Sequence, residues 1–467
     1  MSQAGSKVRE AKIELYRKQG KIHAKATDGR FNRLRWGMVW ITQLVFYGAC
    51  WLSWNSHGNV RQAILFDIAD KKFYLFGLVL WPQDALLLAF ALIVAAALLF
   101  LVTALAGRLF CGFACPQTVY TAIFTWVEAR IEGDHLERLR LDQGPLNARK
   151  LLLKSIKHGL WLLIAGWTAI SFVGYFTPIR TLLPSLAALA IGPWESFWLI
   201  FYALFTYVQA GLAREAVCQH MCPYSRFQGA LSDPATRNVA YDRARGEPRR
   251  NRRQPGNSGD CVDCGICVQV CPTGIDIRDG LQYQCINCGL CIDACNQVMD
   301  KMGYPKGLIR YSTTNALAQH WAPGEILRHV LRPRTIIYAS LIGLIAVALL
   351  VALAVRVPLK VDVIRDRGTL AREVEGGMIE NVYRLQFMNT EERAHRYKID
   401  VRGVETIAIA SDDEVDVPAA STRAVPVRVQ VHPGHGTTGS NKITFDIKAL
   451  DEAGIAVHER SVFIVPR

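Results

Sequence analysis

The sequence predicts an α-helical polytopic membrane bundle of five spans, with a cysteine-rich α+β module inserted into it and an all-β sandwich after it. Three observations predict this architecture. Hydrophobic residues make up 51% of the 467 residues and gather in long runs, which indicate membrane spans rather than one large soluble core. Eight of the 13 cysteines lie within one short stretch. The segment 357–467 alternates repeatedly between apolar and polar side chains.

The spans are predicted from length and composition, because a helix needs about 20 mostly apolar residues to cross a membrane. Five stretches qualify, and they are roughly 36–56, 86–107, 158–176, 196–212 and 335–356. Spans one and two and spans three and four are predicted to form two related hairpins. Between spans three and four, the apolar segment 181–194 is short and contains Pro184 and Pro193, so it is expected to lie at the membrane interface.

The charges predict the orientation of the spans. Lys and Arg residues number ten in 1–35, three in 57–85, eight in 107–157, one in 178–195 and sixteen in 211–334. Positive residues mark cytoplasmic loops. We therefore expect a multi-pass protein of a bacterial inner membrane, with its N-terminus and its twelve clustered cysteines on the cytoplasmic side and its last segment in the periplasm. In this setting the net charge of +14 favours contact with lipid headgroups over binding of nucleic acid.

The cysteine-rich stretch has the spacing of an iron–sulfur module. Its first half reads C-x2-C-x2-C-x3-C-P and its second half repeats the cysteine spacing with Asn296 after the last cysteine. This pattern is typical of bacterial two-cluster ferredoxins, in which the fourth cysteine of each motif binds the other cluster. A pair of zinc sites would show two separated thiol pairs instead. We expect two 4Fe-4S clusters, one held by Cys261, Cys264, Cys267 and Cys295, the other by Cys285, Cys288, Cys291 and Cys271.

Two further cysteine pairs share a CxxxCP motif, each just after a span that runs inward. Cys111 and Cys115 stand in "RLFCGFACPQTVY", and Cys218 and Cys222 stand in "REAVCQHMCPYSRFQ". On a helix, residues i and i+4 lie on one face, so each pair could chelate. Ordinary buried cysteines are the alternative, which the repeated spacing and shared proline disfavour. The four thiols are candidate catalytic and metal-binding residues for copper or a further cluster, and a reversible dithiol stays open.

The alternation in the last segment predicts short antiparallel strands. Apolar residues recur at every second position around Tyr383, Val427 and Phe445, and turn signals such as "HPGHG" separate the runs. About 110 residues of this pattern suggest an immunoglobulin-like sandwich. His432 and His435 are a weak candidate metal pair, and a solvated turn is the simpler interpretation.

These motifs together resemble the cytochrome c oxidase accessory protein family (CcoG, also called FixG or RdxA). The resemblance covers nearly the whole chain, and its motifs are "CGFACPQTVY", "CQHMCPYSRFQ", "CVDCGICVQVCPTGIDIR" and "CINCGLCIDACNQVMDKMGYPKGLIRYST". It implies an immunoglobulin-like C-terminal domain and a cupric reductase that converts Cu(II) to Cu(I) for the copper centre of a cbb3-type cytochrome c oxidase. Cys111, Cys115, Cys218 and Cys222 would then handle copper or relay electrons. The membrane part also resembles NapH- and NosR-type proteins.

The predicted domain boundaries follow from these features. They give a basic cytoplasmic N-terminal segment (1–35), a membrane domain with four spans and both CxxxCP motifs (36–230), a basic linker (231–260), the two-cluster 4Fe-4S ferredoxin module (261–310), a connector (311–334), span five (335–356) and the periplasmic immunoglobulin-like domain (357–467).

Three functions are compatible with this organisation. The first is an oxidoreductase that reduces Cu(II), with an unidentified cytoplasmic electron donor and with the oxidase and its copper-delivery factors as partners. The second is a quinol-linked, NapH/NosR-like electron conduit to a protein partner, for which Trp126, Tyr175, Tyr207 and Gln209 are candidate quinone residues. The third is a non-catalytic scaffold for oxidase assembly. A homodimer is compatible with each of them.

Overall fold

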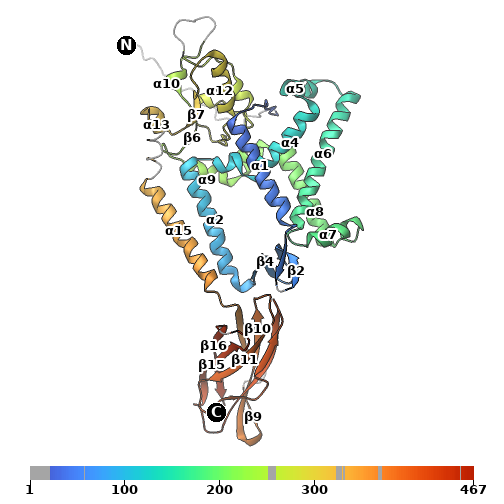
Figure 1. Cartoon of the computed structure of the whole chain (residues 1–467), viewed down its shortest axis with the longest axis vertical. Helices are drawn as coiled ribbons and strands as arrows, with labels where there is room; N and C mark the ends of the chain where they lie inside the picture. The colour runs from blue at the N-terminus through green and yellow to red at the C-terminus, as the bar shows by residue number, and fades with distance from the viewer. Residues whose placement is uncertain are drawn as a thin grey trace, which may run out of the picture. The chain divides into compact units, whose positions relative to one another are not determined.

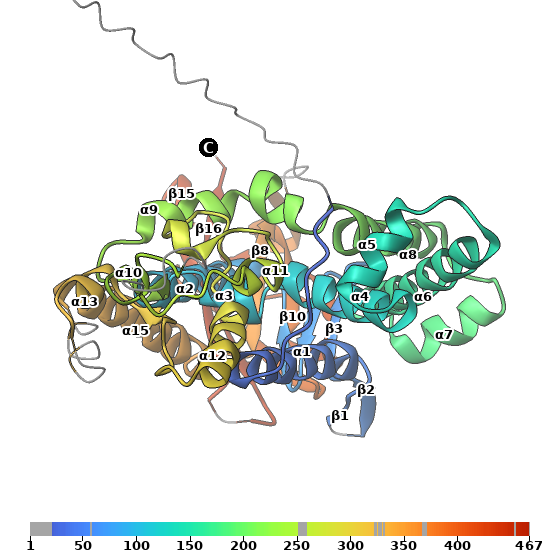
Figure 2. The same cartoon turned by 90° about the horizontal axis from the view of Figure 1, so that it is seen from above.

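The computed structural model describes residues 21–466 except 57, 251–258, 322–324, 326–328, 330–331, 367–370 and 453 (Figures 1 and 2). The predicted basic segment as far as residue 20 and positions 251–258 of the predicted linker lie outside the described residues. The chain divides into two compact units of three segments each. Unit 1 comprises Met1–Trp40, Val102–Leu163 and Thr206–Arg332, and unit 2 comprises Ile41–Leu101, Ile164–Phe205 and Pro333–Arg467.

Four helical segments of the described chain are long and apolar enough to cross a membrane: Pro82–Ala106, Ala148–Val173, Pro193–Ala213 and Pro333–Ala354. They overlap the predicted spans two to five, but the helices end one, three and two residues before the predicted ends of spans two, three and five. They correspond to η1 (Pro82–Asp84) with α2 (Ala85–Ala106), α6 (Ala148–Val173), α8 (Pro193–Thr206) with the π-helix η2 (Tyr207–Ala213), and α15 (Pro333–Ala354).

The first predicted span differs from the structure in its bounds. Helix α1 (Arg30–Ala49) begins earlier than the predicted 36–56 and ends before strand β1 (Ser53–Ser56). It is not among the four segments that meet the length and hydropathy criteria, because its first two turns carry three arginines. Five spans are therefore not confirmed by these criteria.

Strands occupy the segment between α1 and α2, which the sequence analysis treated as a connection. One small antiparallel sheet joins β1 to β2 (Asn59–Gln62), and a second joins β3 (Ile64–Asp67), β4 (Lys72–Leu75) and β5 (Leu78–Leu80). The predicted interfacial segment forms α7 (Ile179–Ala187) and ends where α8 begins. Charged side chains tie these parts of unit 2 together: Arg61 pairs with Glu392, and Asp84 accepts hydrogen bonds from Arg356 and Lys360.

Unit 1 holds all the clustered cysteines on short helices and loops. Its elements besides the spans are α3 (Leu109–Phe113), α4 (Pro116–Glu132), α5 (His135–Gln143), the π-helix η3 (Val217–Met221), α9 (Pro223–Leu231), β6 (Asn238–Tyr241), α10 (Arg243–Gly246), α11 (Ile266–Gln269), η4 (Ile277–Asp279), α12 (Leu290–Met302), β7 (Ile309–Ser312) and α13 (Thr314–Ala318). Strands β6 and β7 pair antiparallel, and their apolar side chains pack with α12 and several cysteines in one core.

The C-terminal part of unit 2 is a sandwich of two antiparallel sheets (Figure 1). One sheet has the order β12-β14-β10-β8 with β9 on β10, and the other has the order β13-β11-β15-β16. Tyr383, Val427 and Phe445, around which the alternation was predicted, are fully buried in the core between them. The strands are β8 (Leu359–Arg365), β9 (Arg372–Val374), β10 (Met378–Asn389), β11 (His395–Arg402), β12 (Ala408–Ile409), β13 (Glu414–Val417), β14 (Thr422–Val431), β15 (Gly439–Ala449) and β16 (Ala456–Val465), with the short helix η5 (Glu375–Gly377) after β9.

Candidate functional site

Two cavities of the cysteine module are lined by cysteines, four in one and five in the other. The cavity that we call the first cluster site is lined by Cys261, Cys264, Cys267 and Cys295. The cavity that we call the second cluster site is lined by Cys271, Cys285, Cys288 and Cys291, and also by Cys267, which the two cavities share. The last cysteine of each motif thus lies beside the first three of the other motif. These are the sets predicted from spacing, and their role as ligands stays a prediction.

The backbone turns in the same way at both sites. Asp263 and Gly265 in one motif and Asn287 and Gly289 in the other adopt φ between +53° and +75°, and the two glycines cap α11 and α12. Left-handed residues alternating with ordinary ones direct successive N–H groups into a concavity that suits an anionic ligand. The structure thus places Gly265 and Gly289 at corresponding positions of the two motifs.

The thiols of the second cluster site are deeply buried. Burial raises the pKa of Cys285 to about 12, and it also raises the pKa of Cys288 and Cys291. Thiols in such surroundings stay protonated unless a metal replaces the proton. Soft sulfur donors, two cysteine-lined cavities and concave backbone turns together fit an iron–sulfur cluster at each site.

The two CxxxCP motifs fold alike. The first cysteine of each motif lies on a short helix, Cys111 on α3 and Cys218 on η3. The second cysteine of each motif, Cys115 or Cys222, is extended and directly precedes a helix that begins with proline. Proline suits this first helical position because its fixed φ fits the helix and its missing N–H is not needed there. The repeat seen in the sequence is therefore also a repeat of local structure.

The motifs meet in one group of four thiols, which we call the four-thiol site. Cys218 interacts electrostatically with Cys111, Cys115 and Cys222. Burial, with a smaller contribution from the neighbouring thiols, raises the pKa of Cys111 to about 11 and that of Cys218 to about 12. His220, which lies between the two cysteines of its motif, is exposed. The structure thus brings together the four predicted cysteines.

Two glutamines link the halves of the four-thiol site reciprocally. Gln117, which follows the first motif, donates from Nε2 to the carbonyl oxygens of Gln209 at 2.9 Å and Arg214 at 3.0 Å. Gln228, which follows the second motif, is fully buried and lies with its Nε2 3.4 Å from Cys111 Sγ. Arg214 has a φ of +43° between the two π-helical segments η2 and η3. Short π-helical stretches are frequent at functional sites.

The four-thiol site is in direct contact with the second cluster site (Figure 2 shows α3 and α12 of this unit). Cys111 packs against the apolar core that contains Ile286 and Cys288. A Cβ at Gly112 would lie 2.6 Å from the Ile286 carbonyl oxygen, so only glycine permits this approach. Arg108 is buried here and faces thiols of both sites, Cys111 and Cys218 on one side and Cys285 on the other.

The spacing of the four thiols is wider than one tetrahedral ion requires. With metal–sulfur bonds of about 2.3 Å, thiolates around one zinc-like ion lie roughly 3.8 Å apart. Among the described residues, the one group of three or more His, Cys, Asp or Glu ligand atoms that lie within 4.8 Å of one another is Glu391, His395 and Glu452.

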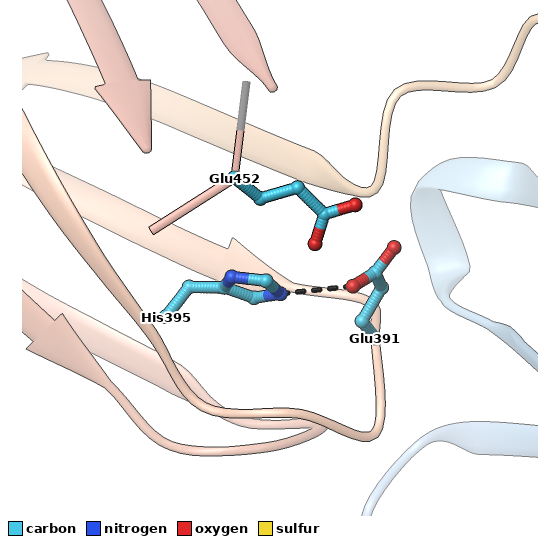
Figure 3. A group of neighbouring side chains, drawn as sticks. All are labelled: Glu391, His395 and Glu452. Atoms are coloured by element: carbon cyan, nitrogen blue, oxygen red, sulfur yellow. Dashed lines mark hydrogen bonds and ion pairs between the residues drawn. The ribbon is translucent and has the colours of Figure 1, made fainter. Parts of the chain in front are cut away.

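The group around His395 was missed by the sequence analysis, which singled out His432 and His435. His395 Nε2 lies 2.8 Å from Glu391 and its Nδ1 lies 2.9 Å from Asp451, with Glu452 close by (Figure 3). Both ring nitrogens therefore already face carboxylates. No local sequence signal joins these residues, because Asp451 lies 56 positions after His395.

The candidate quinone residues occupy separate contacts. Tyr207 bonds through its hydroxyl to His158 Nδ1 at 2.9 Å, and Tyr175 donates to the Phe46 carbonyl at 2.7 Å. Trp126 packs edge-on against Trp36, and Gln209 accepts from Gln117 through its backbone. Tyr175 belongs to unit 2 and the other three to unit 1.

Three family models match the chain. A "4Fe-4S binding domain" matches residues 88–132, which include the first CxxxCP motif. A "4Fe-4S dicluster domain" matches residues 213–314, which include the second motif and all eight cysteines of the module. The family described as "IG-like fold at C-terminal of FixG" matches residues 349–466. The immunoglobulin-like fold of the sandwich and the iron–sulfur character of the chain are thereby confirmed.

Two of the relatives match this chain over nearly its whole length. The chain is 38% identical over 464 residues to protein RdxB of Cereibacter sphaeroides, covering 96% of this chain and 97% of that protein. It is 35% identical to nitrogen fixation protein FixG of Rhizobium meliloti, covering 96% and 93%. Ferredoxin-type protein NapH of Escherichia coli is 25% identical over 49% of this chain and 81% of its own length. The chain is an iron–sulfur electron-transfer protein, and it belongs to the FixG/RdxA family.

Proposed function

We propose that the chain reduces Cu(II) to Cu(I) at the four-thiol site, for assembly of the copper centre of a cbb3-type cytochrome c oxidase. The resemblance to the oxidase accessory family motivates this role. The observation that supports it best is the contact of Gly112 and Cys111 with the Ile286–Cys288 loop, because it sets a copper-compatible thiol group directly against an iron–sulfur site.

In this proposal the module's cysteines hold two 4Fe-4S clusters. Cys261, Cys264, Cys267 and Cys295 bind one, and Cys285, Cys288, Cys291 and Cys271 bind the other. Such clusters supply storage and transfer of single electrons over a wide range of potentials. Cys264 is exposed, so a reduced cytoplasmic protein or small-molecule donor has access to the first cluster site.

The four thiols bind the substrate ion in this proposal. Cys111, Cys115, Cys218 and Cys222 are soft donors, and soft donors favour Cu(I) over Cu(II). One electron converts one Cu(II) to Cu(I), and each thiol that ligates copper releases its proton to water. Gln228 orients the Cys111 sulfur, and Gln117 holds the two motifs together. Arg108 limits the negative charge that builds up when the thiols ionise.

The test uses the anaerobically purified full chain in detergent. Its clusters are reduced and mixed with Cu(II), while their visible absorption and the trapping of Cu(I) by a chelator are followed together. We expect rapid cluster reoxidation with one Cu(I) per electron, and loss of at least tenfold in rate in Cys111→Ser and Cys218→Ser at unchanged iron content.

Cys50→Ser is the matched control, because Cys50 is a buried thiol of unit 2 outside both motifs and should leave the rate unchanged. Clusters that do not respond to Cu(II), or wild-type rates in both motif variants, would remove copper from the four-thiol site.

A quinol-linked conduit to a protein partner is the second candidate, and the similarity of half the chain to NapH favours it. Reduction of the clusters by a quinol in the same preparation, without any response to Cu(II), would support it. Normal oxidase assembly by variants that lack the clusters, at unchanged protein level, would support a scaffold instead.

A further inference from the structure

A buried arginine lies against one of the two cluster sites. Arg35, on the second turn of α1, is only 8% exposed. Its Nε is buried and has no hydrogen-bond partner among the described residues. The groups that it faces electrostatically are Cys288 and Cys271, which both line the second cluster site.

The position of Arg35 follows from how α1 packs on the cysteine module. Phe31 covers Gly289 so closely that a Cβ there would lie 2.7 Å from the Phe31 ring. The backbone N–H of Asn32 donates to Asp293 of α12 at 2.8 Å. Phe31 and Arg35 are four residues apart, so they share one face of the helix. The face that packs on the Cys288–Gly289 turn therefore also carries the guanidinium.

Within the described part of the chain no ion pair balances the buried charge of Arg35, and this needs an explanation. Burying an unpaired charge is costly, and buried guanidinium groups are normally paired with an anion. A cluster held by four thiolates is anionic, and its sulfur atoms accept hydrogen bonds. The unpartnered Nε of Arg35 is thus the kind of donor that such a group would satisfy.

The first cluster site lacks this feature. Arg278 faces Cys267 there, but its guanidinium is bonded to Asp276 at 2.6 Å and to Asp263 at 2.5 Å. Two carboxylates neutralise that charge, and Cys264 is open to solvent, which screens what remains. Among the residues that the structure describes, Arg35 at the second cluster site has no carboxylate partner, and Arg108 adds another buried positive charge near Cys285.

We propose that Arg35 raises the reduction potential of the second cluster site and makes it the more easily reduced of the two. Reduction adds a negative charge, which a fixed positive charge in a poorly polarisable interior stabilises. A single electron supplied from outside then rests at the second cluster site, beside Cys111 and Gly112. The onward transfer of that electron to copper rests on the proposed function, whereas the order of the two reduction potentials does not.

The test is a redox titration of the full chain in detergent, followed by the electron paramagnetic resonance of the reduced clusters. We expect two midpoint potentials in the wild type. Arg35→Met should lower the higher midpoint potential by at least about 59 mV, which corresponds to a tenfold change in the ratio of reduced to oxidised cluster for one electron. The lower midpoint potential should stay unchanged. Arg35→Lys should recover most of the difference.

Arg33→Met is the matched control, because Arg33 lies on the same helix but is exposed, and it should change neither potential. If Arg35→Met loses iron, Arg35→Gln replaces it, since Gln keeps hydrogen-bond donors but carries no charge, and the same drop is expected. Unchanged potentials in the loaded variant, or a drop confined to the lower potential, would overturn the proposal. If the second cluster site has the higher potential but the reduced clusters do not react with Cu(II), the proposed function is refuted and the proposal for Arg35 stands.

Discussion

At the scale of single residues, Gly112 is the position at which the two candidate redox sites touch. Its neighbours at closest approach are backbone atoms of Ile286, Asn287 and Cys288, which cannot rotate away as a side chain would. A methyl group there must therefore separate α3 from the loop of the second cluster site. Overpacking of this kind typically costs about 1–3 kcal/mol.

We expect Gly112→Ala to slow the oxidation of reduced clusters by Cu(II) and to lower the stability of unit 1. Stopped-flow absorption and thermal unfolding in detergent measure the two effects. Gly159→Ala is the control, because a Cβ at Gly159 meets nothing within 4 Å and the change should be neutral. Wild-type kinetics in Gly112→Ala would show that the close contact is not the route of the electron.

The site residues that could be predicted from the sequence are cysteines at short, regular spacing, because that spacing indicates their chemistry. The grouping of Cys271 and Cys295 with the opposite motifs was predicted because the ferredoxin spacing implies the exchange. Arg35 and Arg108 were not singled out, since an arginine near a span end is ordinarily a charge at the membrane surface. Their burial depends on partners more than 100 positions away, to which no periodicity points.

At the scale of elements, a buried ion network joins α4, α5 and α6. Glu128 of α4 is fully buried and accepts from Lys21 at 2.8 Å and from Arg214 at 2.9 Å. Arg138 of α5 and Lys157 of α6 each lie 3.5 Å from it. Burial alone would raise the pKa of Glu128, but Arg214 and the lysines outweigh it and hold the pKa well below its usual range.

We expect Glu128→Gln to destabilise unit 1 by about 3–5 kcal/mol, because it leaves several buried cations without their counterion. Thermal unfolding in detergent tests this. Asp70→Asn should have little effect, since Asp70 forms an exposed pair with Lys72. Equal unfolding temperatures of Glu128→Gln and the wild type would mean that the network contributes nothing net.

The sign of the pH dependence follows from the same carboxylate. Since folding lowers the pKa of Glu128, the ionised form stabilises the fold at neutral pH, and this contribution is lost as the pH falls below the unfolded-state value of 4.5. This network could not be predicted from the sequence, because its members come from five separate elements or segments. Each of them, taken alone, has the pattern of an ordinary surface charge.

At the scale of the whole molecule, the contacts at the two ends of α1 bear on the number of spans. Asn32, in its first turn, bonds to the cysteine module, and Arg61, shortly after the helix, pairs with Glu392 of the sandwich. The module precedes α15 in the chain and the sandwich follows it. If α15 crosses the membrane, α1 must cross it as well, despite its lower hydropathy.

We therefore expect five spans, and alkaline phosphatase fusions test this directly, because the enzyme is active only outside the cytoplasm. Fusions after Asp70 and after Arg467 should be active, and a fusion after Gly307 should be inactive. An inactive fusion after Asp70, with the other two as expected, would mean that α1 stays on the cytoplasmic side.

The interleaving of the two units has a consequence for biosynthesis. The last residue of unit 1 is Arg332, whereas unit 2 needs the 135 residues from 333 to 467, which leave the ribosome last. Every clustered cysteine and every residue of the ion network is therefore translated before the final span and the sandwich exist. Cofactor insertion into unit 1 can therefore be finished on a nascent chain, before the last segment of unit 2 has been made.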